Sequence, residues 1–269
     1  MLLAIDVGNT NTVLGLYTAA TPEAPETLAH SWRITTVQRQ TADELGIQIR
    51  NLFHLHNLDS AVVTGIVISS VVPPIDFVLR QVCENYFHLR PLFIEPGVKT
   101  GVPILTDTPA EAGADRIANC VAAFEKFGGP SIVVDLGTAT TFDVVSSKGE
   151  FLGGAIAPGL GISADALFDN AARLARIEIR KPAKIIGTNT TDNIQIGLYY
   201  GYIGLVDGIL ERMIAELGPT TKVVATGGLA ELIASGSKFI NNVDPNLTLD
   251  GLRIIYDRNR DRLRRRTHA

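Results

Sequence analysis

Short apolar runs alternate with longer amphipathic segments along the whole chain, and this pattern predicts an α/β protein. In the first half, apolar runs predict strands over residues 2–6, 11–17, 27–34, 62–69 and 92–94. A capping box formed by Thr41 and Glu44 begins one helix, and Pro73-Pro74 begins another. The predicted order is therefore three strands, a helix, a strand, a helix and a strand.

The second half of the chain repeats this order with longer helices. It predicts strands over residues 131–136, 141–146, 151–156 and 222–226, and helices after Gly159, over 191–217, after Gly228 and over 249–258. Such a repeat indicates a duplicated domain, and each half has the order typical of a ribonuclease-H-like domain. We expect domains over residues 1–118 and 119–256, a basic tail over 257–269, and a ligand in the interdomain cleft.

Composition excludes several classes of protein. The chain has 269 residues, of which 46% are hydrophobic and 19% charged, so a large core is expected rather than disorder. A net charge of −4 gives no electrostatic case for nucleic acid, and we interpret the arginine-rich segment 258–266 as a solvated end. Cys83 and Cys120 lie among apolar helical residues, which indicates buried thiols in a reducing cytosol. Without a leader or an apolar run of membrane-spanning length, the sequence predicts a cytoplasmic protein with no membrane partner.

The segment between the first two predicted strands has the residues of an anion site. It reads Asp6-Val7-Gly8-Asn9-Thr10-Asn11-Thr12 and leads into the strand at Val13. Gly8 permits a tight turn and a close approach to a ligand, and backbone N–H groups with threonine hydroxyls can hold phosphate oxygens. The Asp6 carboxylate needs a cation or a water beside its charge, and the combination suits a magnesium nucleotide. Taken alone, the segment is equally consistent with an ordinary hairpin.

A second copy of this segment lies between the strands of the second half. It reads Asp135-Leu136-Gly137-Thr138-Ala139-Thr140-Thr141. Two such turns that hold one phosphate chain are the signature of the actin-like ATPase and sugar-kinase superfamily, which the chain resembles at both turns. Gly227-Gly228, directly after a predicted strand, fits the adenosine position of that superfamily, although a plain turn is the alternative.

The stretch Gly113-Ala114-Asp115-Arg116 begins a predicted helix. On spacing alone, a local ion pair is the simpler interpretation of its two charges. The functional interpretation is that Asp115 takes the proton of an alcohol that attacks the γ-phosphate. Arg116 could then hold an anionic group of the substrate.

Six motifs, in order over residues 1–256, resemble the type III pantothenate kinase family. They are Asp6 to Thr12, Ser69-Ser70-Val71-Val72-Pro73, Gly113 to Arg116, Asp135 to Thr141, Gly153-Gly154-Ala155-Ile156-Ala157-Pro158-Gly159, and Asn189-Thr190 with Gln195 and Gly197. Any one motif is loose, but the six together are specific. The Gly-Ala-Asp-Arg stretch separates this family from other actin-like kinases.

The resemblance implies ATP-dependent phosphorylation of the primary hydroxyl of pantothenate, the first step towards coenzyme A. It implies ATP contacts by Asp6, Val7, Gly8, Asn9, Thr10, Asn11, Thr12, Val13 and Thr138. It implies substrate contacts by Gly113, Ala114, Asp115, Arg116 and Thr190, with Asp115 as the proton acceptor. It also implies Mg²⁺ with ATP at Asp6 and a monovalent cation, K⁺ or NH₄⁺, at Asp135.

One position departs from the family pattern. Where the family usually has Tyr-Asp-Asn-Pro, this chain has Thr106-Asp107-Thr108-Pro109, so the aromatic ring that would pack on pantothenate is absent. Two alternative functions stay open at this point. One is a nucleotide-binding regulatory relative, a transcription accessory factor without turnover, and the other is a kinase for a different small alcohol.

The predicted helix over residues 191–217 is apolar around more than one face, which a helix on the surface of a monomer should not be. We therefore expect a homodimer in which Tyr199 or Tyr202 packs across the two-fold axis. The family resemblance implies that Thr190 completes the substrate site of the partner.

Overall fold

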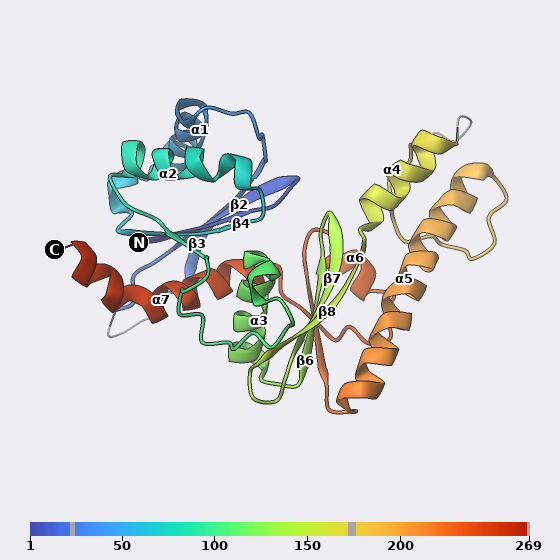
Figure 1. Ribbon diagram of the computed structural model, residues 1–269. Coiled ribbons are helices and arrows are strands. Elements are labelled where there is room, and N and C mark those ends of the chain that lie inside the picture. Colours follow the sequence, from blue (N-terminus) through green and yellow to red (C-terminus); the bar gives the residue numbers. More distant parts are fainter. Residues whose placement is uncertain (22–24, 172–175, 268–269) are drawn as a thin grey trace. The chain divides into compact units, whose positions relative to one another are not determined.

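The computed structural model describes residues 1–21, 25–171 and 176–267, and it contains two five-stranded mixed sheets (Figure 1). The strands are β1 (Leu2–Val7), β2 (Asn11–Tyr17), β3 (Leu28–Thr35), β4 (Gly65–Ser70) and β5 (Leu92–Phe93) in the first sheet, and β6 (Ser131–Leu136), β7 (Ala139–Val145), β8 (Phe151–Pro158), β9 (Lys222–Thr226) and β10 (Asn242–Val243) in the second. Their orders are β3-β2-β1-β4-β5 and β8-β7-β6-β9-β10. In both sheets the first three strands along the chain pair antiparallel and the last two join in parallel. The predicted fold, two ribonuclease-H-like domains of the actin type, is confirmed by this repeated topology.

Helices follow the third, fourth and fifth strands of each repeat, with two helices in the second repeat where the first has one. They are α1 (Ala42–Leu55), α2 (Pro73–Phe87), α3 (Ala114–Phe127), α4 (Leu160–Asn170), α5 (Thr190–Leu217), α6 (Ala230–Ala234) and α7 (Leu247–Thr267), with 3₁₀ turns at Ser60–Val62 and Pro109–Glu111. The chain forms two compact units, one of Met1–Gly101, Thr108–Ala122 and Thr248–Ala269, the other of Val102–Asp107 and Ala123–Leu247. The predicted limits at residues 118 and 256 remain our proposal for the two duplicated folding units.

The first unit buries one face of its sheet under α1 and α2 (Figure 1). Apolar side chains of the strands and the two helices form this core, among them Leu3, Ile5, Leu14, Ile66, Ile68, Leu45, Ile49, Phe53, Ile75 and Leu79. The capping box that begins α1 is present, since Thr41 Oγ1 accepts from the Glu44 N–H and Glu44 Oε2 accepts from the Thr41 N–H. The other face of the sheet contacts α7, because a Cβ on Gly65 would lie 2.0 Å from Tyr256 Oη.

The second unit buries its sheet against α5 and α6. Its core includes Ile132, Val134, Phe142, Tyr199, Val206, Leu210, Val223, Ala225 and Ile233. The period of α5 explains the contact, because a helix places residues three or four positions apart on one face. The buried face of α5 includes residues 199, 202, 203, 206 and 210. This helix carries Thr190 at its first residue, so the core of the second unit fixes the direction from which that residue projects.

Several predicted boundaries were wrong, most of all at the end of the chain. The last helix does not stop at Arg258 but continues to Thr267, so the basic segment is helical. Arg260 forms ion pairs with Glu26 and Asp257, each at 2.8 Å, which holds this part of the helix to the first unit. The strand predicted from residue 62 begins at Gly65 because a 3₁₀ turn occupies residues 60–62.

Within the described residues, no helix is both long enough and apolar enough to cross a membrane. Cys83 and Cys120 are buried and form no disulfide within the described residues, as predicted from their apolar neighbours. Burial raises the pKa of the Cys83 thiol to about 12, so this thiol stays protonated at neutral pH.

Candidate functional site

The turn between β1 and β2 is closed by its own backbone. The Gly8 N–H donates to the Asn11 carbonyl at 3.0 Å, and a Cβ on Gly8 would lie 3.2 Å from the same oxygen. Thr36, just after β3, donates its hydroxyl to the Gly8 carbonyl at 2.8 Å. The Thr12 hydroxyl lies 2.9 Å from that of Thr36. Thr12 is buried and bonded here, so in this structure it braces the turn, while the side chains of Asn9 and Thr10 are exposed at its tip.

Asp6 stands at the end of β1, where the sheet places it between two neighbours. It is opposite Val13 of β2 and in parallel register with Ser69 of β4. The residues that point into the core under α1 and α2 are Leu3, Ile5 and Val7 in β1, and Ile66 and Ile68 in β4, so Asp6 and Ser69 lie together on the opposite face. Ser69 is fully buried, and its hydroxyl has no hydrogen-bond partner among the described residues. Ser69 belongs to the Ser69-Ser70-Val71-Val72-Pro73 motif, from which no role was predicted for its side chain.

The turn between β6 and β7 repeats this plan in the second unit. The Gly137 N–H donates to the Ala139 carbonyl at 3.1 Å, and Thr138 is exposed at the tip. The Thr138 carbonyl accepts from the Gly159 N–H at 3.1 Å, and a Cβ on Gly159 would lie 2.2 Å from that carbonyl oxygen. Residue 159 must therefore be glycine for the start of α4 to approach the turn this closely.

Asp135 ends β6 in the position that Asp6 has in β1. It is paired with Thr141 of β7 and Thr226 of β9. Gly227 follows β9 with φ +95°, and a Cβ there would lie 2.7 Å from Asp135 Oδ1. Glycine at 227 is thus required by the approach to Asp135. Gly228 has open space where a Cβ would be, so a ligand could approach its backbone.

Asp115 lies in the first turn of α3, in the first unit. The Arg116 N–H donates to Asp115 Oδ1 at 2.8 Å, and a Cβ on Gly113 would lie 2.5 Å from the same oxygen. Burial raises the pKa of Asp115 above its ordinary value, and the N–H and charge of Arg116 oppose that rise only partly. A half-buried carboxylate with a raised pKa has the basicity that a proton acceptor needs.

Thr190 is the first residue of α5 and is exposed. The helix begins there because the Asn189 side chain caps it, accepting from the Asp192 N–H at 2.9 Å. The Gln195 amide, one turn further, donates to the Glu178 carbonyl at 2.8 Å. Gln195, for which the sequence predicted no separate role, therefore holds the segment before α5 in place.

The prediction that Tyr199 or Tyr202 packs across a two-fold axis is wrong. Both side chains are buried within the second unit, with 0% and 6% of their surface exposed. The Tyr199 hydroxyl lies 3.1 Å from that of Ser235, and the Tyr202 hydroxyl bonds to Thr140 and to the Pro158 carbonyl. The apolar period of the helix correctly predicted that these side chains are buried. It could not predict whether the sheet of the same chain or a second subunit buries them.

The donor set fits a metal that is bound mainly by its nucleotide. Among the described residues, no group of three or more His, Cys, Asp or Glu side chains could by itself hold a metal ion. Mg²⁺ in phosphotransfer sites commonly takes one or two carboxylates and completes its shell with phosphate oxygens and water. The half-buried Asp6 suits that arrangement, since it is a single carboxylate beside the first turn.

The structure gathers the predicted residues in two groups, one in each unit. The first unit holds residues 6–13 and 113–116, and the second holds Asp135, Thr138 and Thr190. Sequence reasoning missed Thr36, which fastens the first turn. The signal for it was weak, because a threonine after a predicted strand is common.

The repeated sheets and their two Asp-Gly turns define a protein of the actin-like ATPase and sugar-kinase superfamily. Two solved structures share this fold at low identity. The activator of the 2-hydroxyisocaproyl-CoA dehydratase from Clostridium difficile, with bound ADPNP, has a TM-score of 0.51 at 10% identity and covers 99% of this chain and 97% of its own. Component A of the (R)-2-hydroxyglutaryl-CoA dehydratase from Acidaminococcus fermentans has a TM-score of 0.52 at 13% identity, covering 95% and 96%.

Within that superfamily, the sequence model of the family described as type III pantothenate kinase matches residues 2–212. The type III pantothenate kinase of Koribacter versatilis is 60% identical over the full length of both chains. That of Acidobacterium capsulatum is 62% identical and covers 97% of this chain and 96% of its own. The chain therefore belongs to the type III pantothenate kinase family, and the predicted resemblance is confirmed.

Proposed function

We propose that the protein transfers the γ-phosphoryl group of ATP to the primary hydroxyl of pantothenate, the first step of coenzyme A biosynthesis. The observation that carries this proposal is Asp115, a half-buried carboxylate at the start of α3 whose pKa is raised by burial. It stands in the Gly-Ala-Asp-Arg stretch that distinguishes the family. Relatives at 60% and 62% identity, both named type III pantothenate kinase, support the choice of substrate.

In the proposed reaction, the pantothenate hydroxyl oxygen attacks the γ-phosphorus and the bond from that phosphorus to the β-phosphate oxygen breaks. ADP leaves with the electron pair, and Asp115 accepts the hydroxyl proton. Gly113 and Ala114 line the substrate pocket beside it. Arg116 holds an anionic group of the substrate, a task that suits a planar guanidinium.

The phosphates of ATP would be bound by the exposed backbone and side chains of the two turns. In the first turn these are residues 7–13, with Asp6 placing Mg²⁺. In the second turn Thr138 supplies the contact. When bound, Mg²⁺ neutralises charge on the phosphates. The adenosine would lie against the backbone of Gly228, beside which there is open space. The corresponding space beside Gly227 is filled by Asp135.

Asp135 would bind a monovalent cation, K⁺ or NH₄⁺. Its position at the end of β6 duplicates that of Asp6 at the end of β1, so each turn has one carboxylate. One Mg²⁺ leaves part of the charge of a triphosphate uncompensated, and a second cation would reduce the repulsion.

We also propose a homodimer, but through the outward face of α5 rather than through Tyr199 or Tyr202. Gly197, Gly201 and Gly204 recur on that face, with open space where each Cβ would be. Tyr200 lies beside them with 36% of its surface exposed. A helix without side chains on one face allows a second helix to approach closely, and Thr190 at its start would then complete the partner's substrate site. Two buried thiols are consistent with a cytoplasmic enzyme.

The test is ATP consumption measured with and without pantothenate, in potassium and in sodium buffers. Pantothenate-dependent formation of ADP and of a phosphate monoester would support the proposal. ATP binding without turnover on any added alcohol would favour the regulatory alternative. Turnover on another small alcohol but not on pantothenate would indicate that Thr106, which replaces the usual aromatic residue, has changed the substrate.

A further inference from the structure

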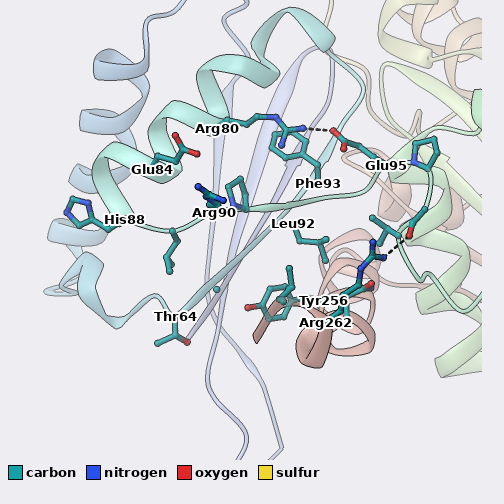
Figure 2. Close-up of a pocket in the computed structure, with 18 residues that line it drawn as sticks. Thr64, Arg80, Glu84, His88, Arg90, Leu92, Phe93, Glu95, Tyr256 and Arg262 are labelled. Atoms are coloured by element: carbon teal, nitrogen blue, oxygen red, sulfur yellow. Dashed lines mark hydrogen bonds and ion pairs between the residues drawn. The ribbon is translucent and has the colours of Figure 1, made fainter. Parts of the chain in front are cut away.

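A cavity of about 870 Å³ opens in the first unit, away from every residue assigned above (Figure 2). Its walls are the end of α2, the segment around β5 and the last turns of α7. The volume lies within the range of roughly 300–1,000 Å³ that small-molecule sites usually have. The proposed reaction gives this cavity no task.

Strand register separates the cavity from the phosphate turn. Thr64 and Gly65, which line it, lie at the start of β4, while Ser69 and its neighbour Asp6 lie at the opposite end of their strands. Four residues separate Gly65 from Ser69, which corresponds to roughly 13 Å at about 3.3 Å per residue. A ligand in the cavity would therefore not contact Asp6.

The walls of the cavity carry one more positive than negative side chain, apart from the histidine. Arg80, Arg90 and Arg262 line it with His88, against the two acids Glu84 and Glu95. Arg80 is already committed, since it pairs with Glu95 and lies 3.9 Å above the ring of Phe93. Arg90 makes no hydrogen bond or ion pair with any residue that the structure describes.

Arg90 and Arg262 come from different walls of the cavity (Figure 2). Arg90 belongs to the segment between α2 and β5, and Arg262 belongs to α7. Arg262 donates one N–H to the Gly97 carbonyl at 3.1 Å, which orients its guanidinium and leaves other N–H groups for a ligand. Two arginines that line one cavity from different walls suit a group with several anionic oxygens, above all a phosphate.

The floor between them is apolar, aromatic and rigid. Tyr256 and Leu92 supply its flat surface, and the Tyr256 hydroxyl lies over Gly65 where any larger residue would collide with it. Asn259 of α7 holds the segment after β5 in place: its side chain accepts from the Lys99 N–H at 3.2 Å and donates to the Lys99 carbonyl at 2.9 Å. Such a floor can accept a ring or a chain attached to the phosphate.

We infer that this cavity is a binding site for an organic phosphate, with the phosphate group between Arg90 and Arg262 and the organic part on Tyr256 and Leu92. This inference goes beyond the proposed function and does not depend on it. A purely structural role is the alternative, because arginines near the ends of α2 and α7 also complement the helix dipoles.

The experiment is a titration of the full-length protein followed by amide NMR signals, with phenyl phosphate as the probe. The amides of Gly65 and Gly97 report on the cavity, and those of Gly8 and Gly137 report on the two phosphate turns. Phenol and inorganic phosphate serve as the uncharged and the ring-free probes. We expect phenyl phosphate to shift the cavity amides at lower concentration than either control probe.

Arg90→Gln and Arg262→Gln should each weaken that binding about tenfold, since each removes charge-assisted hydrogen bonds to the phosphate. Arg33→Gln, an exposed arginine of β3 outside the cavity, should leave it unchanged. The inference is overturned if Gly65 and Gly97 do not shift, or if both variants bind as the parent does and differ only in melting temperature. If inorganic phosphate bound as tightly as phenyl phosphate, the proposed contact of an organic group with Tyr256 and Leu92 would be overturned. The kinase activity of the two variants is measured as well. If it persists while binding of phenyl phosphate weakens, the cavity is tested separately from the proposed kinase function.

Discussion

The turn after β1 and the turn after β6 occupy equivalent places in the two units but are built differently. Val7 pairs with Thr12 across the first turn, and Leu136 pairs with Thr140 across the second. The first turn therefore contains residues 8–11, and the second only residues 137–139. Duplication has kept the strand ends and the carboxylate before each turn, while the length of the turn itself has changed.

The two turns are also fastened to different elements. The first is held locally, because Thr36 at the end of β3 bonds both to Thr12 and to the Gly8 carbonyl. The second is held by a helix, because Tyr202 of α5 bonds to Thr140 and to the Pro158 carbonyl. Since α5 also begins with Thr190, the second turn and the proposed substrate contact are parts of one rigid assembly.

The largest effect on activity is expected from a substitution in the helix that follows the last strand of a sheet. α3 and α7 both have an aspartate in the first turn, Asp115 and Asp250. Asp115→Asn should lower kcat by about 100- to 10,000-fold, as expected for the loss of a general base. Asp250 accepts from the Tyr17 hydroxyl at 2.7 Å, so Asp250→Asn should reduce stability and leave most of the activity. Steady-state kinetics of the two variants would contradict the assignment if they lost activity equally.

The carboxylates before the two turns should respond to different cations. Asp135→Ala is expected to abolish activation by potassium and to leave ATP binding dependent on magnesium. Asp6→Ala should weaken the binding of MgATP in both potassium and sodium. Calorimetric titration and rates in the two salts would separate these outcomes. Equal activity of the parent protein in sodium and potassium would remove the basis for a second cation site.

The long helix of the second unit provides the assembly test. Gly201→Arg on the exposed face of α5 should lower mass and activity together if that face joins two subunits. Light scattering checks the mass, and a matched variant on the exposed side of α1, Arg50→Gln, serves as the control. A parent protein that is an active monomer at micromolar concentration would exclude this dimer.

Glycine substitutions should show that the second turn is packed more tightly than the first. Gly159→Ala places a Cβ 2.2 Å from the Thr138 carbonyl oxygen, so backbone must move, and overpacking of this kind costs about 1–3 kcal/mol. Gly8→Ala meets only the Asn11 carbonyl at 3.2 Å and should cost less. Urea unfolding of both variants tests the order, and a larger loss for Gly8→Ala would reverse the comparison.

Tyr202→Phe should have a smaller effect on stability and on KM. It compares the hydrogen bonds that hold the second turn with those that hold the first. It removes the hydroxyl that bonds to Thr140 and Pro158, and the loss of a buried hydrogen bond costs about 1 kcal/mol. Because Tyr202 lies on the helix of Thr190, we expect the KM for ATP and the KM for pantothenate to rise together. Thr36→Val, which removes the brace of the first turn, should affect ATP alone.

The pH dependence should be the mildest signal, and we expect it from Asp115 in the first unit. Burial raises the pKa of Asp115 above 3.8, so the folded state binds its proton more tightly than the unfolded state does. Stability from this group is present below the unfolded pKa and is lost as pH rises through the folded pKa. Asp115→Asn should therefore melt no lower than the parent at pH 7, and the acid limb of the parent's kcat should lie above pH 3.8. An acid limb below that value would contradict the raised pKa.

Much of this protein could be predicted from its sequence. Apolar runs predicted nearly every strand, and the strand over 131–136 was predicted to the residue, because buried strands must be apolar whatever surrounds them. The Thr41 capping box and the two Asp-Gly turns were equally local, since each depends on residues a few positions apart.

Only the tertiary structure decided what those local patterns contact. The period of α5 was correct, yet whether Tyr199 and Tyr202 face a sheet or a partner depended on the sheet that packs there. Helix α7 continues past Arg258 because Glu26, far away in sequence, pairs with Arg260. Gly227-Gly228 was interpreted as the adenosine position, and only the structure shows that a Cβ at residue 227 would collide with Asp135. Periodicity records that a residue is buried, but the identity of its neighbour is a property of the folded chain.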